Sequence, residues 1–172
     1  MKKYTTITKD LSVLISEVKA YLATHNVDSP EYRLNLYHPL GSTAELISNI
    51  PSLGNAFDSE QLTISGIGHW RIDNVTRVVP SPISVLVVPL SNTASCKFMV
   101  CTSNPDAVTY NDSLTSSPYY YVRDCEVLET VDVVSDSFLV NQGTQYTFEN
   151  PNLEQAEFLL IAFNEDLSSY FA

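Results

Sequence analysis

The sequence predicts an α+β protein in which N-terminal helices pack on a mainly antiparallel β core. Residues 9–25 place apolar side chains at helical spacing, whereas the chain from residue 61 onward is a series of short β-rich segments separated by turn residues. Such a series is typical of a sandwich or barrel rather than of alternating β-α-β units. With 172 residues, of which 44% are hydrophobic, a single domain can bury a substantial core.

The N-terminal part, residues 1–58, is predicted to be rich in helix. Apolar residues recur along one stripe of the segment TKDLSVLISEVKAYLATHN, which indicates a helix over 9–25. Thr8 or Asp10 can cap its start, because a short polar side chain there can accept a backbone N–H. The segment EYRLNLY then predicts a strand over 31–37.

A second, shorter helix is predicted by a capping-box pattern. In GSTAELISNI, Ser42 is followed three positions later by Glu45, so the two can satisfy each other's free backbone N–H groups. We therefore expect a helix over 43–49 and a further turn near SLGNAF. The β-rich part, residues 59–172, belongs to the same domain, because neither a repeat nor a Gly/Ser linker separates it.

Segments of the β-rich part have the length and the aromatic and β-branched content of strands. In chain order they are QLTISGIGHWRID, ISVLVVPL, CKFMVCT, YYYVRDCEVLETV, SFLV, QYTFE and EFLLIAF. The Ser-, Asn- and Pro-rich stretch 102–118 predicts a surface loop or a cavity mouth. In SPYYYVRDCE, Tyr120 should point opposite to Tyr119 and Tyr121 and pack inside, although a tyrosine-lined sugar or partner surface is the alternative.

The charge balance argues against several classes of partner. The formal net charge is −11, and no Lys or Arg follows Arg123. Nucleic acids and anionic membranes require clustered cations, so we expect neither as a partner. No apolar run reaches the ~18 residues of a transmembrane helix. The opening lysines have no apolar segment behind them, so we expect no secretory signal and a cytoplasmic protein.

The cysteines are expected to be buried, reduced thiols. Their number is odd, and no Cys-x-x-Cys motif occurs among Cys96, Cys101 and Cys125. If CKFMVC is a strand, the Cα atoms of Cys96 and Cys101 are ~16 Å apart, beyond the reach of a disulfide. Gly-x-Ser-x-Gly and Walker A motifs are also missing from the sequence, so hydrolase and nucleotide-binding functions have no motif to support them.

Three longer segments resemble the iron- and 2-oxoglutarate-dependent oxygenases of the aspartyl/asparaginyl hydroxylase-like type, over residues 45–165. The helix and strand before that family's first metal motif are resembled by NIPSLGNAFDSEQLTISGIG. The strand that follows the motif is resembled by SVLVVPLSN, and the closing hairpin by DSFLVNQGTQYTFENPNLEQAEFLLIAF. The resemblance implies a double-stranded β-helix core, which is a cupin-like jelly roll. It also implies an Fe(II) site formed by a His-x-Asp/Glu pair and a distal His, with a basic residue for 2-oxoglutarate.

The metal-binding residues of that family do not carry over. The first motif falls on WRID, where Arg71 replaces the first His and Asp73 keeps the carboxylate; a later register near 76–78 has no ligand. The distal His matches Tyr146, and the last strand carries Glu157 in place of a cation. All three histidines precede Asp73, so the C-terminal strands cannot supply a second His: His25, His38 and His69.

Strand alternation divides the segment around GHWRIDN between two faces. The apolar face, which we expect in the core, holds Leu62, Ile64, Trp70 and Ile72. The polar face, expected in solvent or in the barrel mouth, holds Thr63, Ser65, His69, Arg71 and Asp73. Its interpretation stays open between an exposed His69 with a surface Arg71–Asp73 pair, a pocket in which Arg71 binds a carboxylate or phosphate, and an atypical metal site of His69 and Asp73.

The sequence therefore predicts a non-catalytic, oxygenase-like jelly-roll protein without a metal or cofactor. Its expected partner is a small carboxylate ligand or another protein, and the candidate binding residues are His69, Arg71, Asp73 and Tyr146. One alternative is an oxygenase that uses iron and 2-oxoglutarate through atypical ligands. The other is a structural or assembly protein, such as those of viruses, because a jelly roll does not fix a function. The sequence leaves enzymatic activity and oligomeric state open.

Overall fold

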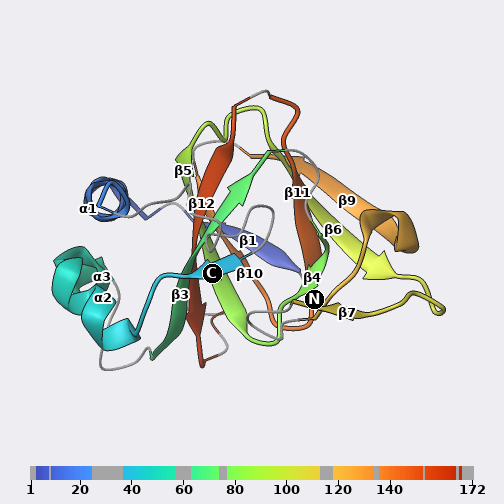
Figure 1. The fold of residues 1–172 in the computed structure, drawn as a ribbon, viewed down its shortest axis with the longest axis horizontal. Coiled ribbons are helices and arrows are strands. Elements are labelled where there is room, and N and C mark those ends of the chain that lie inside the picture. The colour runs from blue at the N-terminus through green and yellow to red at the C-terminus, as the bar shows by residue number, and fades with distance from the viewer. Residues whose placement is uncertain are drawn as a thin grey trace.

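A computed structural model describes most of the chain: residues 3–7, 9–24, 37–56, 63–73, 77–112, 118–133, 136–152, 154–165 and 167. Within these residues, helices flank one face of a six-stranded sheet, and a four-stranded sheet packs on its other face. Figure 1 shows the helices at the left and the strand β9 at the opposite side of the molecule. Among the described residues, no helix combines the length and apolar character needed to cross a bilayer.

The first helix, α1 (Ser12–Leu22), confirms the predicted helix but is shorter than 9–25. It begins where the carboxylate of Asp10 accepts the backbone N–H of Ser12 at 2.9 Å. This hydrogen bond satisfies one of the free N–H groups of the first turn, but the cap position itself is Leu11, whose side chain makes no cap hydrogen bond, so the prediction for Asp10 is confirmed only in part. The other candidate cap, Thr8, lies outside the described residues.

The predicted cap is confirmed for one of its two hydrogen bonds at α2 (Thr43–Asn49), where Ser42 Oγ accepts the Glu45 N–H at 3.2 Å. The turn expected near SLGNAF is the short helix α3 (Pro51–Ala56). The predicted strand over 31–37 lies outside the described residues except for its last residue, at which β2 begins.

All strand pairs in the sheets are antiparallel. The six-stranded sheet has the order β1-β10-β5-β12-β3-β2. Its strands are β1 (Tyr4–Ile7), β2 (Tyr37–Pro39), β3 (Ile64–Ile72), β5 (Ser84–Ser91), β10 (Ser137–Val140) and β12 (Ala156–Phe163). The four-stranded sheet has the order β4-β11-β6-β9. Its strands are β4 (Val79–Pro80), β6 (Lys97–Ser103), β9 (Cys125–Asp132) and β11 (Gln145–Glu149).

The order of the strands is that of a jelly roll. From β3 onward the chain moves repeatedly between the sheets, so that β3-β12-β5-β10 of one sheet faces β4-β11-β6-β9 of the other. The first and last of these eight strands, β3 and β12, are neighbours, and so are the second and the seventh, β4 and β11. This is the double Greek-key arrangement. The predicted fold class, helices packed on a mainly antiparallel jelly-roll core, is therefore confirmed. The strand β1 extends the six-stranded sheet at one edge and was not predicted; β2, which begins at the last residue of the strand predicted over 31–37, extends it at the other edge.

Two apolar layers hold this arrangement together. The layer between the sheets is rich in aromatic rings: Trp70, Phe98, Phe138, Tyr146, Phe148 and Phe158. The layer between the six-stranded sheet and the helices is mainly aliphatic, with Leu14, Val18, Leu46, Leu53, Ile67, Leu159 and Ile161. The strand β12 contributes to both layers in alternation, which explains why EFLLIAF is an unbroken apolar run.

The start of β3 departs from the predicted alternation. Ala162 of β12 pairs with Gly66, but the next residue, Phe163, pairs with Ile64, so the register shifts by one residue. An extra residue in one strand reverses the alternation of side chains beyond it. Ile64 therefore packs toward the helices, and the expectation that it shares a face with Trp70 is wrong.

The aromatic layer gives the first testable prediction. Phe148 is fully buried, and its ring stacks on that of Phe158 with centroids 4.3 Å apart. Because truncation leaves a cavity, we expect Phe148→Ala to lower the free energy of unfolding by about 3–5 kcal/mol. Urea unfolding followed by circular dichroism measures this. In the control Val13→Ala, which alters a 65% exposed side chain, the loss should stay within about 0.5 kcal/mol. Equal losses in the two variants would contradict the packing.

Candidate functional site

His69 and Arg71 lie on the face of β3 that the helices cover. His69 is completely buried and Arg71 is 6% exposed. The neighbouring residue Trp70 points to the opposite side, into the layer between the sheets. The expectation that the polar face lies in solvent or in the barrel mouth is therefore wrong for these two residues, because β2 and the helical layer flank this part of β3.

His69 and Arg71, both buried, form a polar cluster with the partly exposed Glu157 and the exposed Gln155. Glu157 of β12 pairs in register with Arg71, and its Oε1 lies 3.3 Å from Nε2 of His69. A guanidinium nitrogen of Arg71, Nη1, donates a hydrogen bond to Gln155 Oε1 at 3.1 Å. The cluster thus joins adjacent strands through side chains on one face of the sheet.

The cluster keeps the Glu157 carboxyl ionised. The hydrogen bond from His69 is the largest cause that lowers the pKa of Glu157, and burial opposes it. The charge of His69, a hydrogen bond from Ser91 and the charge of Arg71 lower the pKa further. Glu157 therefore provides a stable negative charge beside the buried guanidinium group of Arg71. This charge offsets the cost of burying the guanidinium.

Tyr146 lies on the other side of the six-stranded sheet. It is 3% exposed, and its ring packs edge-on against Trp70 with centroids 5.9 Å apart. Because Trp70 and Arg71 alternate along β3, the structure brings His69 and Arg71 together but separates them from Tyr146. Asp73 follows the end of β3 and is partly buried. That these four residues bind a ligand stays a prediction.

The donor set that the family resemblance implies for Fe(II) does not fit these residues. The position matched to the distal His holds the Tyr146 ring inside an aromatic layer. The described residues contain no group of three or more His, Cys, Asp or Glu side chains that could hold a metal ion. The cysteines are free thiols, and burial raises the pKa values of Cys96 and Cys101 to about 11, so neither is a ready thiolate ligand.

A hollow beside α1 connects the polar cluster to the surface. Its volume is about 350 Å³, and its walls are formed by Lys19, Leu22, Ala23, Leu90, Ser91 and Glu157. The Glu157 side chain is 29% exposed, whereas that of His69 is fully covered. A molecule entering this hollow would therefore meet the carboxylate of the cluster and not its imidazole.

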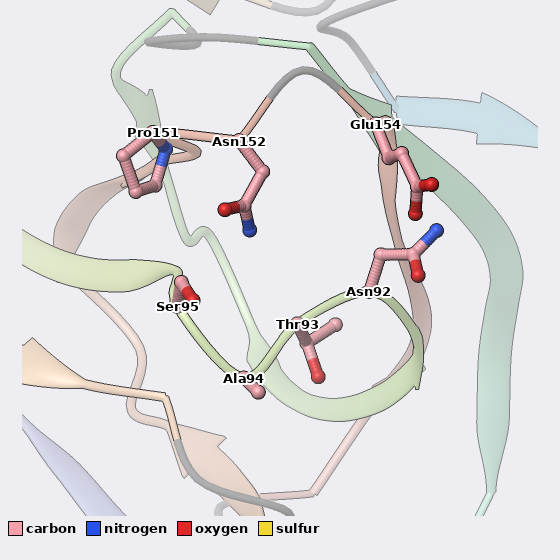
Figure 2. Close-up of a pocket in the computed structure, with 7 residues that line it drawn as sticks. All are labelled: Asn92, Thr93, Ala94, Ser95, Pro151, Asn152 and Glu154. Carbon is pink, nitrogen blue, oxygen red and sulfur yellow. The ribbon is translucent and has the colours of Figure 1, made fainter.

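A second hollow, which we call the rim hollow, lies at one end of the sandwich. The turn after β5 faces the connection from β11 to β12. The open hollow between them has a volume of about 760 Å³. Its lining residues are Asn92, Thr93, Ala94, Ser95, Pro151, Asn152 and Glu154. In Figure 2 the Asn152 side chain points into the hollow, while the side chains of Asn92 and Glu154 approach one another at its edge.

Hydrogen bonds fix the walls of the rim hollow. Asn150 Nδ2 donates to the backbone oxygens of Ile72 at 2.9 Å and of Glu154 at 2.8 Å. Asn92 Nδ2 donates to the backbone oxygen of Gln155 at 3.1 Å. This hydrogen bond links the rim hollow to the polar cluster. The lining carries one carboxylate and no cation, which suits a neutral hydroxyl-bearing or cationic group better than a carboxylate.

Sequence reasoning missed both hollows and the pairing of His69 with Glu157. No motif marks the rim residues, and ENPNLEQ is recognisable only as a turn-forming segment. The one available signal for the cluster is a charged residue, Glu157, at the head of an apolar strand. Its partner cannot be read from the sequence, because it depends on the register between β3 and β12.

In SPYYYVRDCE, Tyr120 points away from Tyr119 and Tyr121 as predicted, but it is only partly buried, whereas Tyr119 is buried. Tyr120 packs toward a small buried cluster with Val78 and Met99. Tyr119 and Tyr121 instead contact Tyr110, with ring centroids 5.7 and 4.8 Å apart. The guanidinium groups of Arg77 and Arg123 lie over the Tyr119 and Tyr121 rings, at 4.5 and 4.7 Å. This tyrosine–arginine cluster combines packing with the side chains that protein interfaces favour.

The secondary structure around these tyrosines differs from the prediction. The stretch 102–118 was expected as a loop but contains part of a hairpin formed by β7 (Tyr110–Asn111) and β8 (Pro118–Tyr119). The single strand expected over 119–131 is divided by the 3₁₀ turn η1 (Val122–Asp124) before β9 begins.

Comparisons with known proteins give little further information. No family model matches the chain, and no curated protein matches it. Among solved structures, a chain from the crystal structure of Drosophila melanogaster CENP-C bound to CAL1 aligns with a TM-score of 0.31 and 9% identity, covering 70% of this chain and 94% of that one. A likeness at this TM-score supports no statement about fold or function.

The pKa shift of Glu157 predicts how acid affects stability. Because its pKa is lower in the folded protein, the carboxylate stabilises the fold above its ordinary pKa of 4.5, and this contribution is lost as the pH falls through the folded value. We expect Glu157→Gln to be less stable than the wild type at neutral pH, with the difference shrinking below pH 4.5. Urea unfolding across a pH series measures it. A difference that grows toward acid pH would contradict the pairing with His69.

Proposed function

We propose that this chain is a non-catalytic jelly-roll protein, of the oxygenase-like kind that its sequence resembles, and that it acts by binding a protein partner. The packing between the two sheets carries the proposal. A jelly-roll oxygenase needs an open chamber for metal and co-substrate, whereas here the rings of Trp70 and Phe148 meet at 5.4 Å and those of Phe148 and Phe158 at 4.3 Å. The proposal therefore includes no resident metal or cofactor.

The polar cluster favours a protein partner over a small carboxylate ligand. Arg71 is almost fully buried, and its guanidinium group already contacts Gln155 beside the ionised Glu157. An incoming carboxylate would have to displace these contacts and approach a like charge. The cluster is better explained as an internal link between β3 and β12.

The surface of the four-stranded sheet supports binding of a protein. Val127 and Leu128 on β9 are 41% and 50% exposed, and the tyrosine–arginine cluster lies next to this sheet, with Val78 bridging to Tyr120. Exposed aliphatic residues together with Tyr and Arg are features of contact surfaces between proteins. The wider alternative of a structural or assembly protein would use the same surfaces.

Introducing histidines at positions 71 and 146, which match the family's two His ligands, tests the proposal. We expect the double variant Arg71→His/Tyr146→His to bind Mn(II) no better than the wild type, because positions 71 and 146 lie on opposite sides of a sheet. Isothermal titration calorimetry with Mn(II), and a turnover assay with Fe(II) and 2-oxoglutarate, measure binding and activity. The variant Tyr146→Phe keeps the ring and serves as the folding control. Stoichiometric metal binding by the wild type, abolished by Asp73→Ala, would overturn the proposal.

A further inference from the structure

One edge of β9 carries no paired strand among the residues that the structure describes. In the four-stranded sheet β9 is the last strand and pairs on its other edge with β6. The strand is eight residues long, Cys125–Asp132. A long edge strand presents backbone N–H and C=O groups that another chain can pair with, and proteins usually cover or shorten such edges.

An apolar groove runs beside this edge. It lies between β9 and β1, the edge strand of the other sheet, and has a volume of about 200 Å³. Its lining residues are Tyr4, Thr6, Phe98, Val131, Asp132, Val133, Asp136 and Phe138. The rings of Phe98 and Phe138, 4.7 Å apart, form part of the lining. A strand added to β9 would turn alternate side chains toward this groove, where their aliphatic stems would be buried beside Glu129.

The charges around the groove are acidic. Glu126, Glu129 and Asp132 are exposed on β9, and Asp136 lies at the groove. Lys97 forms an ion pair with Asp132, and Tyr4 donates a hydrogen bond to Glu129 at 2.9 Å, but β9 itself contains no cation. An occupant that carries positive charge would thus be attracted to this edge and held in register by it.

We infer that the free edge of β9 accepts an extended basic segment of a partner protein as an added strand. The inference rests on the proposed partner-binding function and names its surface. Lys or Arg side chains of the segment meet Glu126 and Glu129, which share the groove face of β9, and its apolar side chains lie over Val127 on the other face. A second copy of this chain is a poor occupant, because pairing β9 with itself would bring two sets of carboxylates together.

A pair of model peptides tests the inference. The probe is a short peptide of alternating valine and lysine, and its counterpart alternates valine and glutamate. Isothermal titration calorimetry should detect the lysine peptide and not the glutamate peptide, and hydrogen exchange should show new protection confined to residues 125–132. Glu126→Lys should weaken binding about fivefold, whereas the matched control Glu154→Lys, with the same change of charge in the rim hollow, should change it by less than about twofold.

The inference would be overturned by equal loss of affinity in the two variants, by equal binding of the two peptides, or by protection outside β9. A wild-type dimer that protects the same residues would also overturn it, because the occupant would then be a second copy. The experiments distinguish failure of the proposed function from failure of the β9 assignment. Metal-dependent turnover would refute the non-catalytic proposal and leave the peptide result unaffected, whereas peptide failure without turnover would refute only the assignment of the β9 edge.

Discussion

Aromatic packing between the two sheets is the constraint on which the rest of the structure depends. The rings of Trp70, Phe148 and Phe158 are fully buried and in contact through Phe148, so among the described residues aromatic side chains fill the space where the two sheets meet. The six-stranded sheet is then covered by aromatic rings on one face and by helices on the other. Any polar side chain on its central strands must therefore find a partner inside the protein.

This constraint explains the polar cluster. His69 and Arg71 lie buried on β3, and Glu157 of β12 and Gln155, just before that strand, supply the compensating contacts. Removing one partner of such a buried pair costs more than the pair contributes, so these residues serve the fold first. The surfaces to which the proposals assign recognition lie at the periphery, in the rim hollow, the tyrosine–arginine cluster and the edge of β9.

The features that could be predicted from the sequence are those set by local spacing. Apolar periodicity and the Ser42–Glu45 pattern identify two helices, and short apolar runs identify the strands of the jelly roll. The bulge that reorients Ile64 and the pairing of His69 with Glu157 could not be predicted, because both depend on how β12 aligns with β3 across most of the chain length. Arg71 and Tyr146 were grouped by resemblance to a family whose metal site this chain does not reproduce.

The central claim is that the space between the sheets is a closed aromatic core, and Trp70, the chain's single tryptophan, lies inside it. Its fluorescence, measured with acrylamide and then with Mn(II) and 2-oxoglutarate, tests the claim directly. The packing predicts blue-shifted emission that acrylamide quenches only after unfolding and that Mn(II) leaves unchanged. Emission typical of exposed tryptophan in the folded protein, or saturable quenching by Mn(II) that 2-oxoglutarate strengthens, would contradict it.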